Sequence, residues 1–213
     1  MRDWADITIR SLLVSGSATI LAALIGIPAG AWLGLMGRGV RLWVRPVVFS
    51  LMAMPPVVMG LALYLLLSHS GPLGRLEWLY SVRAMILAQT LLALPFVIGV
   101  TMQGIAAVPG ELAQQLRSLG ANAAQVRWAI LREAYPAMGL AVAAALGRSL
   151  SEVGAVLMVG GSIAASTDVL TTAIYQETRS GNFGIALALG AILLVLAWSA
   201  NLAVAVWQRE PAT

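Results

Sequence analysis

The sequence predicts an all-α, polytopic membrane protein, and two observations support this prediction. Of the 213 residues, 60% are hydrophobic and only 10% are charged, whereas a soluble domain carries roughly 25% charged residues. The apolar residues form long runs, and a run of about 20 apolar residues is long enough to cross a bilayer as a helix. No polar stretch approaches the roughly 50 residues of a small soluble domain, so we expect a single transmembrane domain over residues 1–213.

Five apolar runs predict about five transmembrane helices. The first run is too long for the apolar core of a signal peptide and follows a start of mixed charge, so we expect it to be retained as a span. An odd number of spans argues against two equal halves of the kind found in secondary transporters. The expected spans are residues 12–35, 47–67, 84–105, 136–159 and 183–207.

The first two spans contain residues that disturb a regular apolar helix. Gly26 and Gly30 favour a close packing face over a pore lining, because small side chains let helices approach each other in lipid. Pro55 and Pro56 remove backbone donors and break or kink a helix near mid-membrane depth. Such a break is tolerated only where protein or an aqueous cavity covers it. The two prolines are therefore candidates for a translocation pathway, with a packed kink as an equal alternative.

The polar segments outside residues 108–135 contain few candidate catalytic or metal-binding residues. His69 lies in a Ser-His-Ser-Gly-Pro turn, where a solvated histidine is favoured over a metal ligand. The absence of Cys excludes disulfides and thiolate metal sites, and we expect neither a metal centre nor a catalytic site. The Ser/Thr-rich segment 160–182 predicts a short helix over residues 169–178, either external or re-entrant.

A polar interruption over residues 108–135 separates the third and fourth spans. Leu112, Leu116 and Leu119 have the i, i+4, i+7 spacing of one helix face. Gly120 follows directly and is a typical helix stop. A membrane protein with one such internal interruption is expected to use it to meet a partner in water.

A second helix is predicted in the same interruption. Asn122 is a candidate N-cap for a helical run over residues 123–131. Pro136 then opens the fourth span in its first turn, where proline is tolerated. The expected element is a short helix, a glycine break and a second helix leading back to the membrane, a shape that suits a stiff peg at a protein interface.

The arginine distribution predicts how the chain is oriented in the membrane. With five spans, the first loop, the interruption and the C-terminal tail share one side. That side holds seven arginines, namely Arg38, Arg41, Arg45, Arg117, Arg127, Arg132 and Arg209. The positive-inside rule places these segments and the C-terminus in the cytoplasm and the N-terminus outside. The net charge is +4, and the arginines lie mostly in short loops beside apolar runs. This placement indicates topology signals and not nucleic-acid binding.

The interruption resembles the cytoplasmic loop of type I ABC importer permeases, whose pattern is Glu-Ala-Ala, then Gly, then Ile and Leu-Pro. With Gly120 at the family's glycine, Gln114 falls at the Glu position and Ile130 at the Ile position. The alanine pair is lost and the proline comes late, and a generic amphipathic loop helix is the alternative. The resemblance implies that the loop is a coupling helix that docks in a groove of a separate ATPase subunit. The implied coupling residues are Gln114, Gln115, Leu116, Arg117, Leu119, Gly120 and Ala121.

The fourth span strengthens this resemblance. The runs Gly-Arg-Ser-Leu-Ser-Glu-Val-Gly-Ala-Val (147–156) and Thr-Asp-Val-Leu-Thr-Thr (167–172) look like the oxyanion branch of these permeases, most closely the tungstate-type permeases. Met-Pro-Pro-Val-Val-Met-Gly in the second span and Leu-Pro-Phe-Val in the third are similar to the same branch. Molybdate and sulfate relatives share these proline motifs. Together the resemblance covers nearly the whole chain.

Two charged residues lie inside the fourth span. Arg148 and Glu152 are spaced i, i+4, which places them on one face of a helix. Because an unpaired charge in the membrane costs on the order of several kcal/mol, we expect them to pair with each other near Ser149 or Ser151. The pair either fixes helix packing or lines the pathway. Arg148, Ser151 and Glu152 therefore join the two prolines as pathway or gate candidates.

The expected function is that of the permease subunit of an ATP-driven importer for a tetrahedral oxyanion, with tungstate first, in a bacterial or archaeal plasma membrane. The chain has no GxxxxGK[ST] phosphate loop, so it is not expected to be an enzyme or to hold a cofactor. ATP and Mg belong on a separate ATPase subunit. The resemblance implies a homodimer in the bilayer that meets a pair of ATPase subunits and an extracytoplasmic binding protein.

Three alternatives to this function remain. A molybdate or sulfate permease is the nearest. An ion-driven secondary carrier built from small subunits would use Arg148 and Glu152 as its coupling site. A structural membrane subunit without a transport role would have a sealed interface.

Overall fold

The computed structural model describes residues 4–208 of the chain. Every regular element in this range is a helix, which confirms the predicted all-α class. In chain order the elements are α1 (Trp4–Leu35), α2 (Arg38–Met52), α3 (Pro56–Leu67), the 3-10 helix η1 (Gly74–Leu76), α4 (Val82–Ala107), α5 (Gly110–Ser118), α6 (Ala123–Glu133), α7 (Tyr135–Ser151), α8 (Gly154–Gly160), α9 (Leu170–Arg179) and α10 (Phe183–Gln208).

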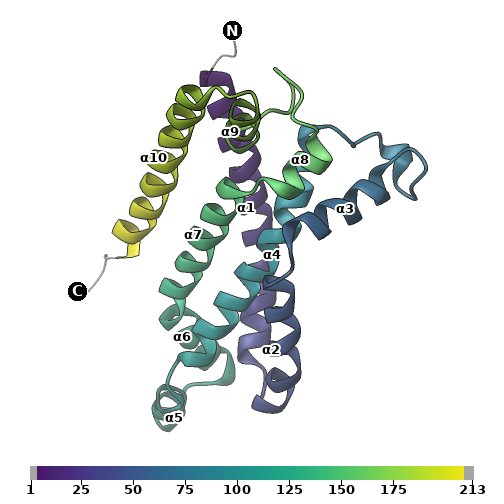
Figure 1. The fold of residues 1–213 in the computed structure, drawn as a ribbon. Coiled ribbons are helices and arrows are strands. Elements are labelled where there is room, and N and C mark those ends of the chain that lie inside the picture. Colours follow the sequence, from purple (N-terminus) through teal and green to yellow (C-terminus); the bar gives the residue numbers. More distant parts are fainter. Residues whose placement is uncertain (1–3, 209–213) are drawn as a thin grey trace.

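The helices form an elongated bundle in which α4 packs against both α1 and α7 (Figure 1). Helix α2 lies along one end of α4, and α3 projects sideways from the bundle. Helix α10 lies on the other side, against α7 and α9. The α1–α2 connection and α5 lie at the same end of the bundle, and α9 lies at the opposite end (Figure 1).

Among the described helices, three are long and apolar enough to cross a membrane: α1, α4 and the part of α10 over residues 183–202. The number rises to five if each of two bent helix pairs forms one crossing. These pairs are α2 with α3, bent by 84°, and α6 with α7, bent by 49°. Helix α10 leaves large apolar side chains exposed, such as Leu187 at 75% and Leu194 at 72%, which suits contact with lipid.

Small residues bring α1 and α4 together. A Cβ atom on Gly30 would lie 2.6 Å from the carbonyl oxygen of Ile98, and one on Gly26 would lie 2.8 Å from Cβ of Val97. At these distances the two backbones leave no room for a side chain. The predicted packing role of Gly26 and Gly30 is confirmed, since close approach is the main source of helix association in lipid.

Two of the expected spans contain a broken helix. In the second, α2 ends at Met52 and α3 begins at Pro56, because Pro55 and Pro56 supply no amide hydrogen to continue the ladder. In the fourth, the expected helix over residues 136–159 is divided into α7 and α8, with a turn at Glu152. This second break was not predicted.

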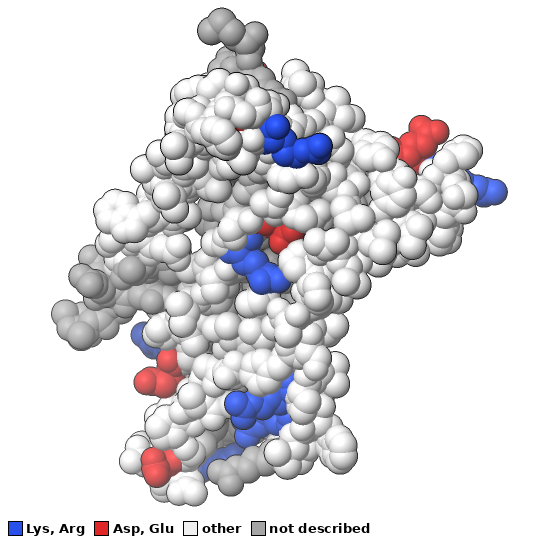
Figure 2. Space-filling model, viewed as in Figure 1, with Lys and Arg blue, Asp and Glu red and all other residues white. Residues whose placement is uncertain are grey.

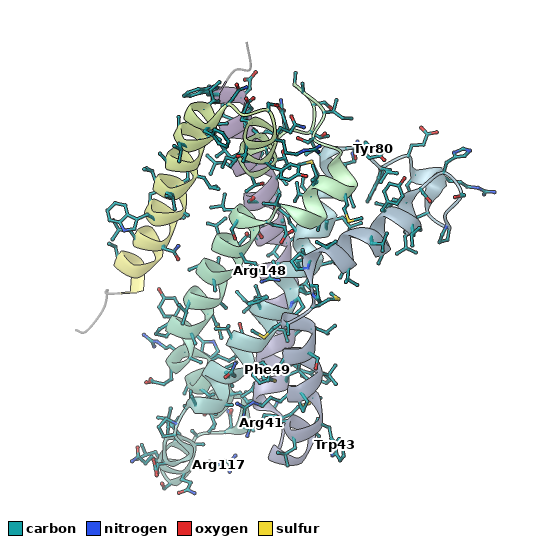
Figure 3. All side chains as sticks on the ribbon, in the orientation of Figure 1. Arg41, Trp43, Phe49, Tyr80, Arg117 and Arg148 are labelled. Carbon is teal, nitrogen blue, oxygen red and sulfur yellow. The ribbon has the colours of Figure 1, made fainter. Side chains whose placement is uncertain are left out.

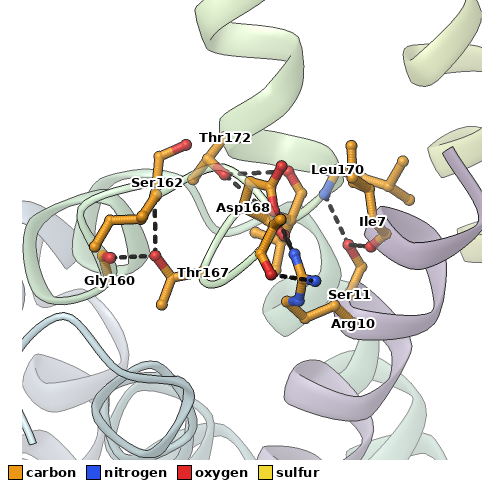
Figure 4. A network of polar contacts seen from close by, with 12 residues as sticks. Ile7, Arg10, Ser11, Gly160, Ser162, Thr167, Asp168, Leu170 and Thr172 are labelled. Atoms are coloured by element: carbon orange, nitrogen blue, oxygen red, sulfur yellow. Dashed lines mark hydrogen bonds and ion pairs between the residues drawn. The ribbon is translucent and has the colours of Figure 1, made fainter. Parts of the chain in front are cut away.

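A polar network ties the start of α1 to the loop before α9 (Figure 4). Arg10 forms an ion pair with the buried Asp168 and also donates to the carbonyl oxygen of Ala165 at 3.2 Å. Ser11 accepts a hydrogen bond from the backbone N–H of Leu170 at 2.7 Å. Arg10 and Ser11 precede residue 12, the expected start of the first span. The helix is longer than expected, since α1 begins at Trp4. The short helix predicted over residues 169–178 is confirmed as α9.

Candidate functional site

Helix α5 is the outermost part of the predicted coupling element (Figure 1). None of its residues is buried. The three leucines of the predicted apolar face differ in exposure. Leu112 and Leu116 are half-buried, whereas Leu119, just beyond the helix, is 84% exposed. The element therefore presents Leu119 to its surroundings, together with Trp128 of α6, which is 63% exposed.

The turn between α5 and α6 is held by its own hydrogen bonds. Gly120 has a φ of 87°, a left-handed conformation that favours glycine. The backbone N–H of Ala121 donates to the carbonyl oxygen of Leu116 at 2.9 Å, which closes the end of α5. Asn122 and Gln125 cap α6 reciprocally, each side-chain oxygen accepting from the other residue's N–H, at 3.0 and 2.8 Å. The predicted glycine stop and N-cap are confirmed.

The structure brings the seven predicted coupling residues together on this one projecting turn. All of them are exposed or half-buried: Gln114, Gln115, Leu116, Arg117, Leu119, Gly120 and Ala121. Helix α6 leads through Ala134 directly into α7. The turn is therefore joined to α7 through α6, with a bend of 49° between the two helices.

The chain turns sharply at Glu152, between α7 and α8. The backbone there is extended, with φ −74° and ψ 124°, and the residue is only 7% exposed. The carboxylate Oε1 accepts a hydrogen bond from the backbone N–H of Ala155 at 2.9 Å, and the Thr171 hydroxyl donates to the carbonyl oxygen of Glu152 at 3.0 Å. A carboxylate at the start of a helix is stabilised by the free amides there, so this burial is satisfied.

The predicted ion pair between Arg148 and Glu152 does not form. Because α7 ends at Ser151, the i, i+4 spacing no longer places the two side chains on one helix face, and Glu152 turns to the start of α8. Arg148 instead stacks on Phe96 of α4, with its guanidinium carbon 4.4 Å from the ring centroid (Figure 3 labels Arg148). Its buried Nε has no hydrogen-bond partner among the described residues.

The two helix breaks lie against each other. A Cβ atom on Gly154 would lie 2.8 Å from Cγ2 of Val57 and 3.6 Å from Oε1 of Glu152. One turn further along, a Cβ on Gly60 would lie 2.7 Å from Cα of Ala155. Helices α3 and α8 are therefore in close contact directly after their breaks. Figure 2 shows acidic and basic atoms together in a hollow in the middle of this face.

The five pathway or gate candidates thus fall into one region, apart from the coupling residues. The breaks at Pro55, Pro56 and Glu152 adjoin, and Arg148 and Ser151 occupy the last turn of α7. Ser151 is exposed and donates to the carbonyl oxygen of Gly147 at 3.0 Å.

Sequence reasoning missed two contacts in this region. Phe96, the partner of Arg148, lies within the Leu-Pro-Phe-Val motif, whose position in the third span was the one available signal. Gln89 donates to the carbonyl oxygen of Ser149 at 3.0 Å, deep between α4 and α7. Within the described residues, no group of three or more His, Asp or Glu side chains is placed to hold a metal ion.

Several known proteins are similar to this chain in sequence. Residues 26–210 match the family model described as the binding-protein-dependent transport system inner membrane component. A probable anion ABC transporter permease protein of Haloferax volcanii is 42% identical over 201 residues, which cover 92% of this chain and 87% of that protein. A tungstate uptake system permease protein of Peptoclostridium acidaminophilum is 36% identical over 200 residues, which cover 94% of this chain and 88% of that protein.

A solved structure has the same fold. The inward-facing MetNI methionine ABC transporter superimposes with a TM-score of 0.72 at 20% sequence identity, over 94% of this chain and 92% of the matched chain. The family match covers most of the chain, and both relatives align along nearly its whole length. The chain therefore belongs to the family of binding-protein-dependent transport system inner membrane components.

Proposed function

We propose that this chain is the permease subunit of an ATP-driven importer for a tetrahedral oxyanion, with tungstate as the first candidate. The two relatives are named for anion transport and for tungstate uptake. The observation that carries the proposal is the projecting α5–α6 turn, whose coupling residues are all exposed or half-buried. A bundle that lacks a phosphate loop needs such a surface, on which a separate ATPase can act.

In this proposal the α5–α6 turn receives the ATPase stroke. Leu119, exposed at the tip, enters a groove of the ATPase subunit, and Gly120 allows the sharp turn behind it. The reciprocal cap of α6 keeps the turn stiff. Because α6 continues into α7, closure of the ATPase pair tilts α7 and changes the break at Glu152.

The adjoining breaks of α3 and α8 form the gate of the pathway. Irregular backbone at membrane depth is tolerated only where protein or water covers it, and two such breaks lie in contact here. Arg148 supplies positive charge beside them without a carboxylate partner among the described residues. Its stacking on Phe96 lets it attract an oxyanion and still release it, while tight selection is left to an extracytoplasmic binding protein.

The working assembly is a homodimer with a pair of ATPase subunits that hold ATP and Mg, and this chain itself hydrolyses nothing. The α5 end faces the cytoplasm, with the N-terminus outside and the C-terminus inside. Support for this orientation comes from the arginines that lie at that end of the described chain, among them Arg41 and Arg117 (Figure 3). A symmetric pair places the pathway on its two-fold axis.

Cellular uptake tests the proposal. A strain without this gene should lose tungstate uptake, and the gene supplied in trans should restore it, with uptake abolished by ATP depletion. Molybdate and sulfate measured in the same cells separate the three oxyanions. Uptake that persists without the gene, or that follows a proton or sodium gradient and not ATP, would contradict the proposal.

A further inference from the structure

A pocket of about 640 Å³ opens between α2 and α4. Figure 1 shows α2 near the end of the bundle that carries α5. The two helices touch near Gly99, where a Cβ would lie 2.7 Å from Sδ of Met52, and the pocket lies about one to two turns further along α4. The residues that line this α2–α4 pocket are Arg41, Leu42, Arg45, Pro46, Met102, Gln103, Ala106 and Ala107.

Two arginines give the α2–α4 pocket its charge. Arg41 and Arg45 are spaced i, i+4 and share one face of α2. Arg41 donates one hydrogen bond to the carbonyl oxygen of Gly34 at 3.2 Å, and Arg45 lies over the ring of Phe49, 5.3 Å from its centroid. These contacts hold the two side chains and leave most of their N–H groups without a partner in the described chain. The pocket lining contains no acidic residue.

The surroundings of the pocket favour an anionic ligand. Apart from its two arginines and Gln103, the lining residues of the pocket are apolar, so no other charged side chain of the lining competes for the guanidinium groups. Figure 2 shows a basic patch in the lower part of this face, and Figure 3 labels Arg41 there. Guanidinium groups present forked donors that match the oxygens of phosphate-like anions.

The pocket also lies at a level that suits a membrane surface. On the same helix, Trp43 is 84% exposed and Leu42 is 73% exposed, and tryptophan beside arginine is typical of a bilayer interface. Basic pockets between transmembrane helices bind phosphate head groups of anionic lipids. A free oxyanion in the adjacent water offers the same chemistry.

We propose that the α2–α4 pocket binds a tetrahedral oxyanion group between Arg41 and Arg45, as the phosphate of an anionic phospholipid or as a free anion. The site lies between α2 and α4 and includes no residue of α3 or α8. Binding there requires neither the ATPase nor transport. Binding can be measured on the purified permease alone, so failure of the import proposal would leave this one standing.

The lipid arm of the test uses the full-length permease in a neutral detergent. Native mass spectrometry counts retained phosphatidylglycerol against retained phosphatidylcholine. We expect selective retention of phosphatidylglycerol, weakened about tenfold in Arg45→Gln, because one charge-assisted contact is lost. Arg127→Gln is the matched control: it removes the same charge at the same end of the bundle, outside the pocket.

The free-anion arm follows the thermal unfolding midpoint of the same proteins during titration with sodium tungstate or sodium phosphate. A saturable rise that Arg45→Gln loses and Arg127→Gln keeps assigns the pocket to a free anion. Selective lipid retention without such a rise assigns it to a head group. The proposal is overturned if neither ligand binds selectively, or if Arg127→Gln loses as much binding as Arg45→Gln.

Discussion

At the scale of single residues, Arg148 carries a positive charge into the middle of the bundle and meets an aromatic ring there. Stacking over an aromatic face is worth about 0.5–2 kcal/mol, which offsets part of the cost of burial without neutralising the charge. A carboxylate partner would cancel the field of the guanidinium, whereas Phe96 does not. In the proposed pathway, an oxyanion would be attracted to Arg148 without the tight binding that would stall transport.

We expect Arg148→Gln to lower oxyanion uptake by about tenfold or more, since it removes the charge and keeps a polar side chain of similar reach. Arg148→Lys keeps the charge and should retain more uptake. Uptake into proteoliposomes with the ATPase subunits and the extracytoplasmic binding protein present measures the effect, with the amount of assembled complex as a control. Normal uptake by Arg148→Gln would assign Arg148 to helix packing and remove it from the pathway.

At the scale of elements, local signals in the sequence were sufficient for the α5–α6 turn and insufficient for the break after α7. Gly120 and Asn122 act on their immediate neighbours, so the stop of α5 and the cap of α6 follow from a few adjacent residues. The break at Glu152 involves Thr171, which lies far along the chain. An apolar run alone therefore predicted one continuous helix and placed Arg148 and Glu152 on the same face.

The polar network around α9 shows the same limit. Arg10 and Asp168 are 158 residues apart in the sequence, and each alone resembles an ordinary charged residue outside a span. Their pairing depends on α1 and the α8–α9 loop meeting in space, which no periodic pattern encodes. Element type was predictable from hydropathy, whereas the partners of buried polar groups were not.

The coupling turn provides a test at this scale. Leu119→Asp places a charge on a side chain that is 84% exposed, so folding of the permease should be unaffected. We expect loss of co-purification with the ATPase subunit, because the charge would be desolvated in the proposed groove. Glu133→Gln, on an exposed residue at the far end of α6, should leave co-purification intact. Full recovery of the ATPase with Leu119→Asp would refute the docking role of this turn.

At the scale of the whole molecule, α3 is difficult to explain in an isolated chain. It projects from the bundle (Figure 1) and leaves several apolar side chains exposed, including Val58 at 54%, Leu61 at 46% and Leu65 at 58%. Its inner side packs on α8 through Gly60. A second copy related by a two-fold axis would cover this helix and enclose the two breaks from the other side.

The absence of Cys from the sequence makes this arrangement directly testable. Single cysteines at Val58, Leu61 and Leu65 in turn should allow a thiol-specific cross-linker to join two permease chains in membranes, because α3 helices of the two copies face each other in the proposed dimer. Leu24→Cys is the matched control, since Leu24 is also exposed, at 68%, but lies on α1, outside the proposed α3 interface. Cross-linking through Leu24 and through none of the α3 positions would place the dimer interface elsewhere and leave the α3–α8 contact outside a shared pathway.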